Sequence, residues 1–248
     1  MIPVGPNDLG IIAQQITHTQ KNIIGYRHIY IIPCDPQLSF PGCITVPENC
    51  FPFTIDDMAL NPKLLTSQRR GWYLQQLLKL YAGQVIPGIA DKYLVIDADT
   101  FFLRPTTMID SDQESTVCLY AFSSNHNVPY FDHMSRLHPS LTKIDGQKSG
   151  ICHHMMFENK YLNELFDMVS SRHQSMPFWR VFLNCIDPNE YHRSGASKYE
   201  LYYNFMLKYH PTQIKNRSLK CADVSELDFD TYVNGGYDYI SYHHYNRK

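Results

Sequence analysis

The sequence has little that would link it to nucleic acid, zinc or a membrane. Charged residues make up 19% of its 248 residues, the formal net charge is -2, and lysine and arginine form no block. The basic footprint of a duplex nucleic-acid binder is therefore missing. Its seven cysteines form no C-x-x-C pair, which argues against zinc. No apolar run approaches the roughly 18 residues that a transmembrane helix needs. There is no internal repeat and no low-complexity tract.

The cysteine count and the first residues predict a reducing compartment. Seven is an odd number, and the segment 2–16 is interrupted by Pro3, Pro6 and Asp8, so it lacks the apolar stretch of a signal peptide. Free thiols are then the simpler interpretation. We therefore expect a cytoplasmic protein, and its oligomeric state is left open.

The most informative segment present is Asp97-Ala98-Asp99. It follows the apolar run Tyr93-Leu94-Val95-Ile96, which is typical of a buried strand, and a second apolar run begins two residues later. Bare carboxylates are costly to bury, so the pair must reach water or face positive charge. Ligands of open α/β sheets lie just beyond the carboxyl ends of strands, and oxygen donors suit Mg²⁺ and Mn²⁺. The pair is therefore a candidate metal site, although an Asp-x-Asp sequence is also common in solvated turns.

The order of apolar patterns predicts a single mixed α/β domain. A short strand at 1–4, a helix at 9–22 and a strand at 27–33 make a βαβ unit. Further predicted elements are a short strand at 44–46, a helix at 66–81 closed by Gly83 and Pro87, strands at 93–96, 117–122, 152–157 and 237–245, and helices at 160–171 and 199–209. The segment between 122 and 138 is expected to be a long polar loop, with Asp132 and His133 as acceptor-binding candidates.

Several polar residues near these elements are candidates for ligand contact. Arg69 and Arg70 precede the helix that contains Gly71, where arginine suits phosphate but opposes the helix dipole. Trp72 and Gln75 lie on the same helix face as Lys79 and are candidates to border a bound nucleotide. For Trp72, a place in the core is an equal alternative. One of His153 and His154 is expected to face the core and the other a cleft, where it would touch donor sugar or phosphate.

Glu200 has two interpretations. Ser197 and Glu200 have the spacing of a capping box at the start of a helix, and a carboxylate is also favoured there by the helix dipole. The alternative role is that of a general base that activates an acceptor hydroxyl. The spacing supports the cap directly, and the base role depends mainly on the resemblance described next.

The motif Asp97-Ala98-Asp99-Thr100-Phe101-Phe102, at the end of an apolar strand, resembles the D-x-D motif of GT-A nucleotide-sugar glycosyltransferases. Further segments resemble a short branch of GT-A-like enzymes, in the same order along the chain, from residue 2 to about 209. They are the opening residues 2–8, Gly71–Lys79, Pro129–Phe131, His153–Phe157 and Ser197–Tyr203. Each segment alone is weak, but their joint order is specific for the fold and for glycosyl transfer.

The resemblance implies a GT-A-like, Rossmann-type mixed sheet flanked by helices, with a nucleotide-binding half (1–105) and an acceptor-binding half (106–248). It implies Mn²⁺ or Mg²⁺ as cofactor and a UDP-sugar donor. Asp99 would bind the metal, and Asp97 the metal or the ribose. The remaining residues implied in donor binding are Pro3, Val4, Gly5, Asp8 and Ala98. GT-A enzymes often supply a late histidine to the metal, which here means His243 or His244, because the chain ends in Ile240-Ser241-Tyr242-His243-His244 and lacks the His-x-x-Gly-x-x-Lys-Pro-Trp ending of one retaining branch.

The sequence therefore favours a metal-dependent hexosyl- or pentosyltransferase that moves a sugar to a glycan or another hydroxyl acceptor. Two alternatives remain open. One is a non-catalytic module that binds a nucleotide-sugar, and the other is a Mg²⁺-dependent phosphoryl-transfer enzyme built on Asp97 and Asp99. The sugar, the acceptor and the stereochemical outcome are not determined by these motifs.

Overall fold

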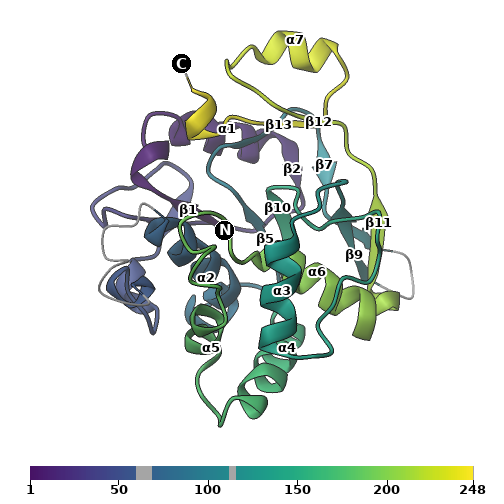
Figure 1. Cartoon of the computed structure of the whole chain (residues 1–248). Helices are drawn as coiled ribbons and strands as arrows, with labels where there is room; N and C mark the ends of the chain where they lie inside the picture. The colour runs from purple at the N-terminus through teal and green to yellow at the C-terminus, as the bar shows by residue number, and fades with distance from the viewer. Residues whose placement is uncertain (60–68, 112–115, 248) are drawn as a thin grey trace.

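The computed structural model describes residues 1–59, 69–111 and 116–247 and contains both strands and helices (Figure 1). The strands are β1 (Ile2–Val4), β2 (Ile23–Ile24), β3 (Ile29–Pro33), β4 (Cys43–Thr45), β5 (Lys92–Ile96), β6 (Thr100–Phe102), β7 (Thr106–Thr107), β8 (Ile109–Ser111), β9 (Thr116–Ala121), β10 (His154–Glu158), β11 (Ile214–Arg217), β12 (Cys221–Asp223) and β13 (Tyr239–Ser241). The helices are α1 (Ile12–Asn22), α2 (Arg70–Val85), α3 (Val128–Leu137), α4 (Asn159–Arg172), α5 (Phe178–Asn184), α6 (Lys198–Tyr209) and α7 (Phe229–Asn234).

The strands pair in small groups that lie edge to edge. One group has the order β4-β3-β1 with parallel pairs, and β5 pairs antiparallel with β10. The first group joins β5 through Met1, because Ile96 N donates to the Met1 carbonyl at 3.1 Å. On the other side, Tyr120 of β9 donates its hydroxyl hydrogen to the Met156 carbonyl of β10 at 2.8 Å. The predicted mixed α/β class is confirmed, in one domain.

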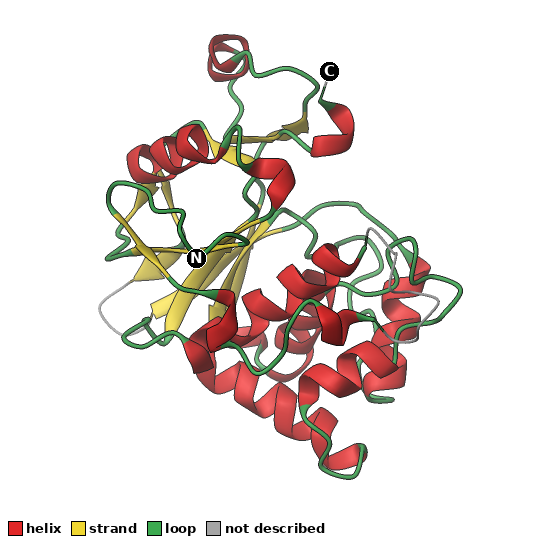
Figure 2. Cartoon of the chain, turned by 90° about the vertical axis from the view of Figure 1, so that its left-hand side faces the viewer, coloured by secondary structure: helices red, strands yellow, loops and turns green. Residues whose placement is uncertain are grey.

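Helices cover the two sides of these strands unequally. Figure 2 shows a large group of helices below the strands and fewer helical segments above them. The large group contains α2 to α6, in which α2 contacts β1, α4 contacts β10, and α6 packs against α2, α3 and α4. Helix α1 packs against β6 on the opposite side. No helix of the described residues is long and apolar enough to span a membrane.

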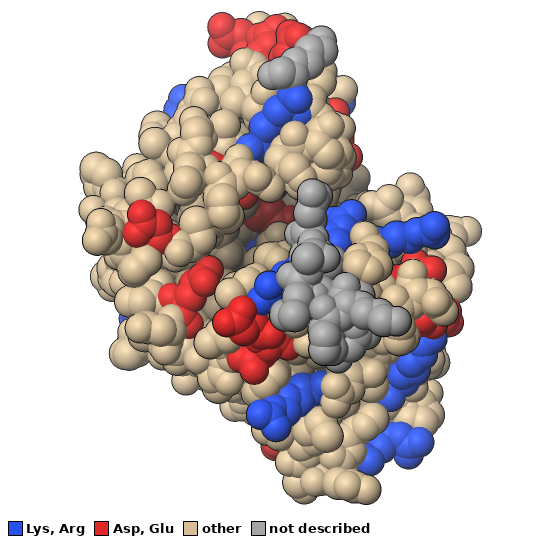
Figure 3. Space-filling view, turned by 60° about the vertical axis from the view of Figure 1, so that its left-hand side comes forward, with Lys and Arg blue, Asp and Glu red and all other residues tan. Residues whose placement is uncertain are grey.

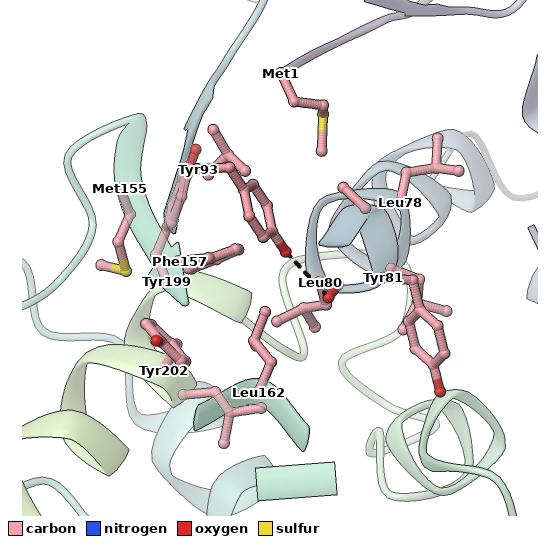
Figure 4. Packing of buried hydrophobic residues seen from close by; sticks show 14 of the residues in the cluster. Met1, Leu78, Leu80, Tyr81, Tyr93, Met155, Phe157, Leu162, Tyr199 and Tyr202 are labelled. Carbon is pink, nitrogen blue, oxygen red and sulfur yellow. Dashed lines mark hydrogen bonds between the residues drawn. The ribbon is translucent and has the colours of Figure 1, made fainter. Parts of the chain in front are cut away.

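Tyrosine fills much of the core between β5, β10 and the helices (Figure 4). Its hydroxyl needs a partner when buried, and backbone atoms of neighbouring elements supply it. Tyr93 donates to the Lys79 carbonyl at 3.2 Å, Tyr81 accepts from Trp179 N at 3.0 Å, and Tyr202 accepts from Glu158 N at 3.1 Å. The high tyrosine content of this chain is thus explained in large part by the core.

Helix α2 continues past the predicted end. The predicted start at residue 66 and the predicted cap Ser67 lie outside the described residues, and α2 runs from Arg70 to Val85, beyond Gly83. A Cβ at Gly83 would lie 1.7 Å from Asn159 Oδ1 and 2.7 Å from Tyr93. Asn159 also donates to the Gly83 carbonyl at 2.8 Å. Gly83 therefore permits close packing of α2 against α4, and the prediction that it ends the helix is wrong.

The predicted loop before residue 138 contains helix α3. Pro129 lies in the first turn, where it is favoured, and Tyr130, Met134 and Leu137 form its buried face. His133 is fully buried and its Nε2 lies 2.8 Å from the Phe182 carbonyl. The proposed acceptor-binding role of His133 is therefore wrong, because the side chain is part of the core. The elements without a prediction are helices α5 and α7 and strands β2, β6, β7, β8, β11 and β12.

Candidate functional site

The two aspartates of the D-x-D segment lie where β5 ends. Strand β5 is buried against β10, and the chain turns directly after Ile96, with Thr100 N donating to the Asp97 carbonyl at 3.0 Å. Ala98 is buried, whereas the side chains of Asp97 and Asp99 have relative solvent exposures of 19% and 15%. Both carboxylates therefore lie at the edge between core and solvent, as the sequence predicts.

Strand pairing brings the C-terminal part of the chain to this edge. Strand β13 runs antiparallel to β6 with Ser241 opposite Thr100, and β12 runs parallel to β13 with Asp223 opposite Ser241. The backbone pairing extends by one step, since Tyr242 N donates to the Asp99 carbonyl at 2.8 Å. His243 and Asp223 consequently lie beside Asp99, although about 140 residues separate β6 from β13 in sequence.

His153 is the residue immediately before β10, and it contacts Asp97. Its φ of 62° is left-handed, a conformation that is uncommon outside glycine and that concentrates at functional sites. The His153 carbonyl accepts from Asp97 N at 2.8 Å, and its Nδ1 lies 3.3 Å from Asp97 Oδ2. His154 turns to the core, where its Nδ1 lies 2.7 Å from the Cys152 carbonyl. The prediction that one histidine faces the core and the other the site is confirmed.

Burial lowers the pKa of His154 to about 3, so its ring is neutral. Its ring packs edge-on against Phe102 and Tyr239. The predicted contact of His154 with a donor is not supported by this position, because the side chain is 3% exposed and its Nδ1 is 2.7 Å from the Cys152 carbonyl. His153 alone of the pair is placed to touch a ligand.

Two lysines and a tyrosine surround Asp97. Lys79 Nζ and Tyr199 Oη both donate to Asp97 Oδ1, the latter at 2.7 Å. Lys79 is fully buried in α2, and Lys198 of α6 is 6% exposed, with its ammonium over the Tyr199 ring. Burial alone would raise the pKa of Asp97, but the charges of Lys79 and Lys198 outweigh it and hold that pKa well below its usual value. Asp97 is therefore ionised within a cationic surrounding.

Lys198 itself experiences the opposite balance. Burial and the neighbouring Lys79 lower its pKa well below the usual value, against the attraction of Asp97. Two buried lysines thus share one carboxylate, and the shift in pKa favours the neutral form of Lys198. Strongly shifted pKa values of this kind cluster at functional sites.

His243 lies between two carboxylates. Its Nδ1 is 2.8 Å from Asp99 Oδ2, and its Nε2 is 3.4 Å from Asp223 Oδ1, an ion-pair distance at which hydrogen-bond geometry is not met. Burial would lower the pKa of His243, but Asp223 and Asp99 raise it to about 10. The neighbouring His244 is exposed, and its ring makes an edge-to-face contact with the Tyr245 ring. Of the two late histidines, the structure places His243 at the site.

Metal-binding side chains converge here. Within the described part of the chain, the group whose ligand atoms all lie within 4.8 Å of one another consists of His153, Asp223 and His243. Asp99 adjoins this group through His243, and Asp97 adjoins it through His153. Imidazole and carboxylate are suitable ligands for first-row divalent metals. The buried, unpartnered Nε2 of His243 supports the fit of a cation.

The first loop of the chain borders the same edge. Pro3 and Val4 are buried in β1, and Gly5 leads into a short 3-10 helix, Pro6–Asp8. Burial raises the pKa of Asp8, against its hydrogen bond from Arg247 at 2.7 Å, and the charges of Asp99 and Asp97 add to the rise. The predicted nucleotide-binding loop therefore lies within electrostatic range of the D-x-D pair.

The residues of α2 that were predicted to contact a ligand make hydrogen bonds or packing contacts within the protein. Arg70 donates to Asp56 Oδ1 at 2.7 Å and to the Ile55 carbonyl at 2.8 Å, and so holds the segment before α2. Gln75 accepts from Lys79 Nζ at 2.8 Å, which orients the lysine toward Asp97. Trp72 is half-buried and packs against the core beside Tyr73.

Glu200 is fully buried in the first turn of α6. Its Oε2 accepts from Ser149 Oγ at 2.7 Å and from Gly150 N at 3.0 Å, and its Oε1 accepts from Asn204 Nδ2 at 3.3 Å. Ser197 Oγ accepts from Glu200 N at 3.2 Å, so the predicted N-cap is present. In this arrangement Glu200 anchors the segment that leads to His153, and its role as a base stays a prediction that the burial does not favour.

The surface of the molecule is hollowed on one face. Figure 3 shows a hollow between the two parts of the molecule, with acidic side chains inside it and on its rim. A separate cavity of about 540 Å³ has a mostly apolar lining that includes Ile24, Tyr30, Tyr93 and Met108. None of the charged side chains around Asp97 and Asp99 lines that cavity.

Four residues of the site were not predicted for it: Lys79, Lys198, Tyr199 and Asp223. A lysine among the leucines of α2 was the one available signal, because a charged residue on an apolar helix face needs a buried partner. Asp223 carries no such signal, since its position depends on the pairing of β12 with β13.

Comparison with known proteins gives a family and several similar folds. The sequence model of a family described as a family of unknown function matches residues 46–225. No curated protein matches the sequence. The structure is similar to that of mouse xyloside xylosyltransferase 1 in its apo form, with 9% identity, a TM-score of 0.46, and coverage of 97% of this chain and 96% of that chain.

Two crystal structures of LgtC are similar at the same level. One is an active-site mutant, with 9% identity, a TM-score of 0.49, and coverage of 97% of this chain and 85% of that chain. The other is described as the galactosyltransferase LgtC in complex with donor and acceptor sugar analogs, with 8% identity, a TM-score of 0.45 and the same coverage. At this degree of likeness we draw no conclusion on activity, and the function is argued from the residues of the site.

Proposed function

This chain belongs to the family DUF6492, whose model spans most of it, and we propose that it is a metal-dependent glycosyltransferase with a nucleoside-diphosphate sugar, such as a UDP-sugar, as donor. The acceptor would be a hydroxyl group of a glycan or another molecule. One observation carries the proposal. The D-x-D aspartates, a late histidine and two buried lysines meet at the carboxyl end of β5, where ligands of α/β sheets lie.

The charges of this site suit a diphosphate. When a diphosphate leaves the sugar, negative charge develops on it, and a divalent cation would neutralise that charge as a Lewis acid. The carboxylates and imidazoles around Asp99 would hold the cation. Lys79 and Lys198 are already ordered and shielded from water, so these two donors need little reorganisation when the anion arrives, and the charge of a bound diphosphate would favour the protonated form of Lys198.

Other residues would position the donor. The loop after β1, with Asp8 half-buried near the D-x-D pair, is suited to border the nucleoside. His153, whose backbone is left-handed, is partly exposed beside Asp97, where it would be able to contact a sugar or phosphate group. Holding the two substrates in a fixed orientation lowers the barrier by several kcal/mol. No residue is assigned here as the base for the acceptor.

The experiment is a donor assay with product identification. The purified chain is incubated with a panel of UDP-sugars, with and without Mn²⁺, and free UDP, free sugar and inorganic phosphate are measured separately. Release of UDP that requires Mn²⁺ and is lost in Asp99→Asn supports the proposal. Asp230→Asn, an exposed carboxylate in α7, is the matched control and should behave as wild type.

The alternatives give different products. A binding module would show Mn²⁺-dependent stabilisation by UDP-sugars in thermal unfolding, because a ligand that binds the folded state raises the melting temperature, but it would release no UDP. A phosphoryl-transfer enzyme would release inorganic phosphate or UMP. Either result contradicts the assignment as a glycosyltransferase.

A further inference from the structure

Each aspartate of the D-x-D pair contacts the Nδ1 atom of a different histidine. Asp97 Oδ2 lies 3.3 Å from His153 Nδ1, and Asp99 Oδ2 lies 2.8 Å from His243 Nδ1. The two rings lie next to each other, with centroids 4.6 Å apart. A histidine that binds a metal through one ring nitrogen usually donates the other N–H to a carboxylate, which fixes the ring and its tautomer. Both histidines have Nδ1 next to a carboxylate, and a ring that donates its Nδ1–H there has Nε2 left for a ligand.

The atoms on the Nε2 side have the spacing of a cation site. His243 is 7% exposed, and its Nε2 has no hydrogen-bond partner within the described residues. It lies 3.4 Å from Asp223 Oδ1, and one ligand atom from each of His153, Asp223 and His243 fits within 4.8 Å. Two donors at about 2.1 Å from one cation lie about 3 Å apart at neighbouring corners of an octahedron. The 3.4 Å between His243 Nε2 and Asp223 Oδ1 is already close to this spacing.

The D-x-D carboxylates are already committed to other groups. Asp97 Oδ1 accepts from both Lys79 and Tyr199, and its Oδ2 faces His153. Direct binding of a cation by Asp97 would therefore bring it close to a buried ammonium group. By contrast, the Asp223 side chain is 60% exposed and is free to approach a cation from the solvent side.

We propose that the cation of this protein is bound by Nε2 of His153, Nε2 of His243 and the carboxylate of Asp223, while Asp97 and Asp99 orient the two imidazoles. The catalytic role of the cation rests on the proposed function, but its binding is measured without a sugar nucleotide. Three protein ligands leave corners open for phosphate oxygens. Two nitrogen ligands favour a first-row transition metal such as Mn²⁺ over Mg²⁺ or Ca²⁺, which prefer oxygen.

The test is titration of the full chain with Mn²⁺ alone. Binding is measured by electron paramagnetic resonance, as the loss of the signal of the free ion. Pulsed measurements on the bound ion count the coupled histidine nitrogens. Wild type should show two imidazoles. His243→Gln and His153→Gln should each remove one coupled nitrogen, and Asp223→Asn should keep both but weaken binding by more than about 100-fold. Asp99→Asn should weaken binding by about 10- to 100-fold, as the loss of an orienting group does, with both nitrogens retained.

Matched controls separate the site from its surroundings. His244→Gln and Asp230→Asn change an adjacent exposed histidine and an exposed carboxylate, and both should bind Mn²⁺ within twofold of wild type. Circular dichroism and melting temperature identify variants that do not fold, and the exposed Asp223 variant is expected to fold in any case.

Three results overturn the assignment. The first is a bound Mn²⁺ without nitrogen coupling, and the second is no Mn²⁺ binding by folded wild type. The third is unchanged binding in Asp223→Asn together with complete loss in Asp97→Asn and Asp99→Asn, which would make the D-x-D carboxylates the direct ligands. Failure of the donor assay with a Mn²⁺ site of this composition would refute the proposed function and leave the ligand assignment standing.

Discussion

Replacing Glu200 by glutamine distinguishes an anchor from a catalytic base. Glutamine keeps the shape of the side chain but removes its charge. If its amide oxygen takes the place of Oε2, it still accepts from Ser149 and Gly150, but as a neutral acceptor. Its NH₂ group then takes the place of Oε1 and faces Asn204 Nδ2 at 3.3 Å and Lys143 Nζ at 3.9 Å, so a donor meets donors.

The magnitude follows from these contacts. A hydrogen bond to a charged group contributes about 1.5–3 kcal/mol and one to a neutral group about 0.5–1.5 kcal/mol, so two weakened bonds lower the free energy of unfolding by about 2 kcal/mol. Asn204 cannot relieve the clash by turning its amide, because its Oδ1 accepts from Ile144 N at 2.8 Å. In Glu200→Ala, Ser149 Oγ and Gly150 N lose their acceptor, while Asn204 Nδ2 keeps the Glu200 carbonyl at 2.9 Å, and we expect a loss of about 3 kcal/mol or more.

The assay is urea unfolding of wild type, Glu200→Gln, Glu200→Ala and the matched control Glu164→Gln, fitted with a common slope. Glu164 pairs with His210 on the surface of α4, where an ion pair contributes about 1 kcal/mol at most. Midpoints for the glutamine variant within error of wild type, together with a loss below about 1 kcal/mol for the alanine variant, would refute the anchoring role. If, in addition, transfer activity fell by about 10²- to 10⁴-fold at unchanged stability, a base role for Glu200 would be supported.

Three further predictions concern stability around the site. Burial lowers the pKa of His133 from 6.5 to about 4, so between these pH values the unfolded chain binds a proton at this residue and the folded chain does not. As pH falls from 6.5 to 4, the free energy of unfolding of wild type should therefore decrease by about 3 kcal/mol relative to that of His133→Gln. Parallel curves of unfolding free energy against pH would contradict this. Gly150→Ala places a Cβ 2.5 Å from Tyr203 Cβ and should lower the unfolding free energy by about 1–3 kcal/mol in urea, whereas Gly146→Ala, which has open space, should not. Ser197→Ala removes the cap of α6 and should cost about 1 kcal/mol in the same measurement, with an unchanged value as the contrary result.

Local patterns in the sequence determined much of the fold and the position of the D-x-D pair. The buried strand before Asp97 follows from a run of β-branched and aromatic residues, and the cap at Ser197 follows from a spacing of three. These predictions succeed because they depend on neighbours a few residues apart. Helix α3 was missed although Tyr130, Met134 and Leu137 have helical spacing, because the polar residues between them are also typical of loops.

The composition of the site was decided by the tertiary structure. The choice of His243 over His244 depends on the register of β13 against β6, because a shift by one residue in a strand exchanges the residues that face each side. Asp223 is at the site because β12 pairs with β13, and Lys198 is there because α6 packs against α2. Sequence spacing records neither contact, since strand register and helix packing are fixed by the burial of the whole core. The sequence therefore determined where an acidic pair must meet positive charge, and the folded chain decided which histidines and lysines supply it.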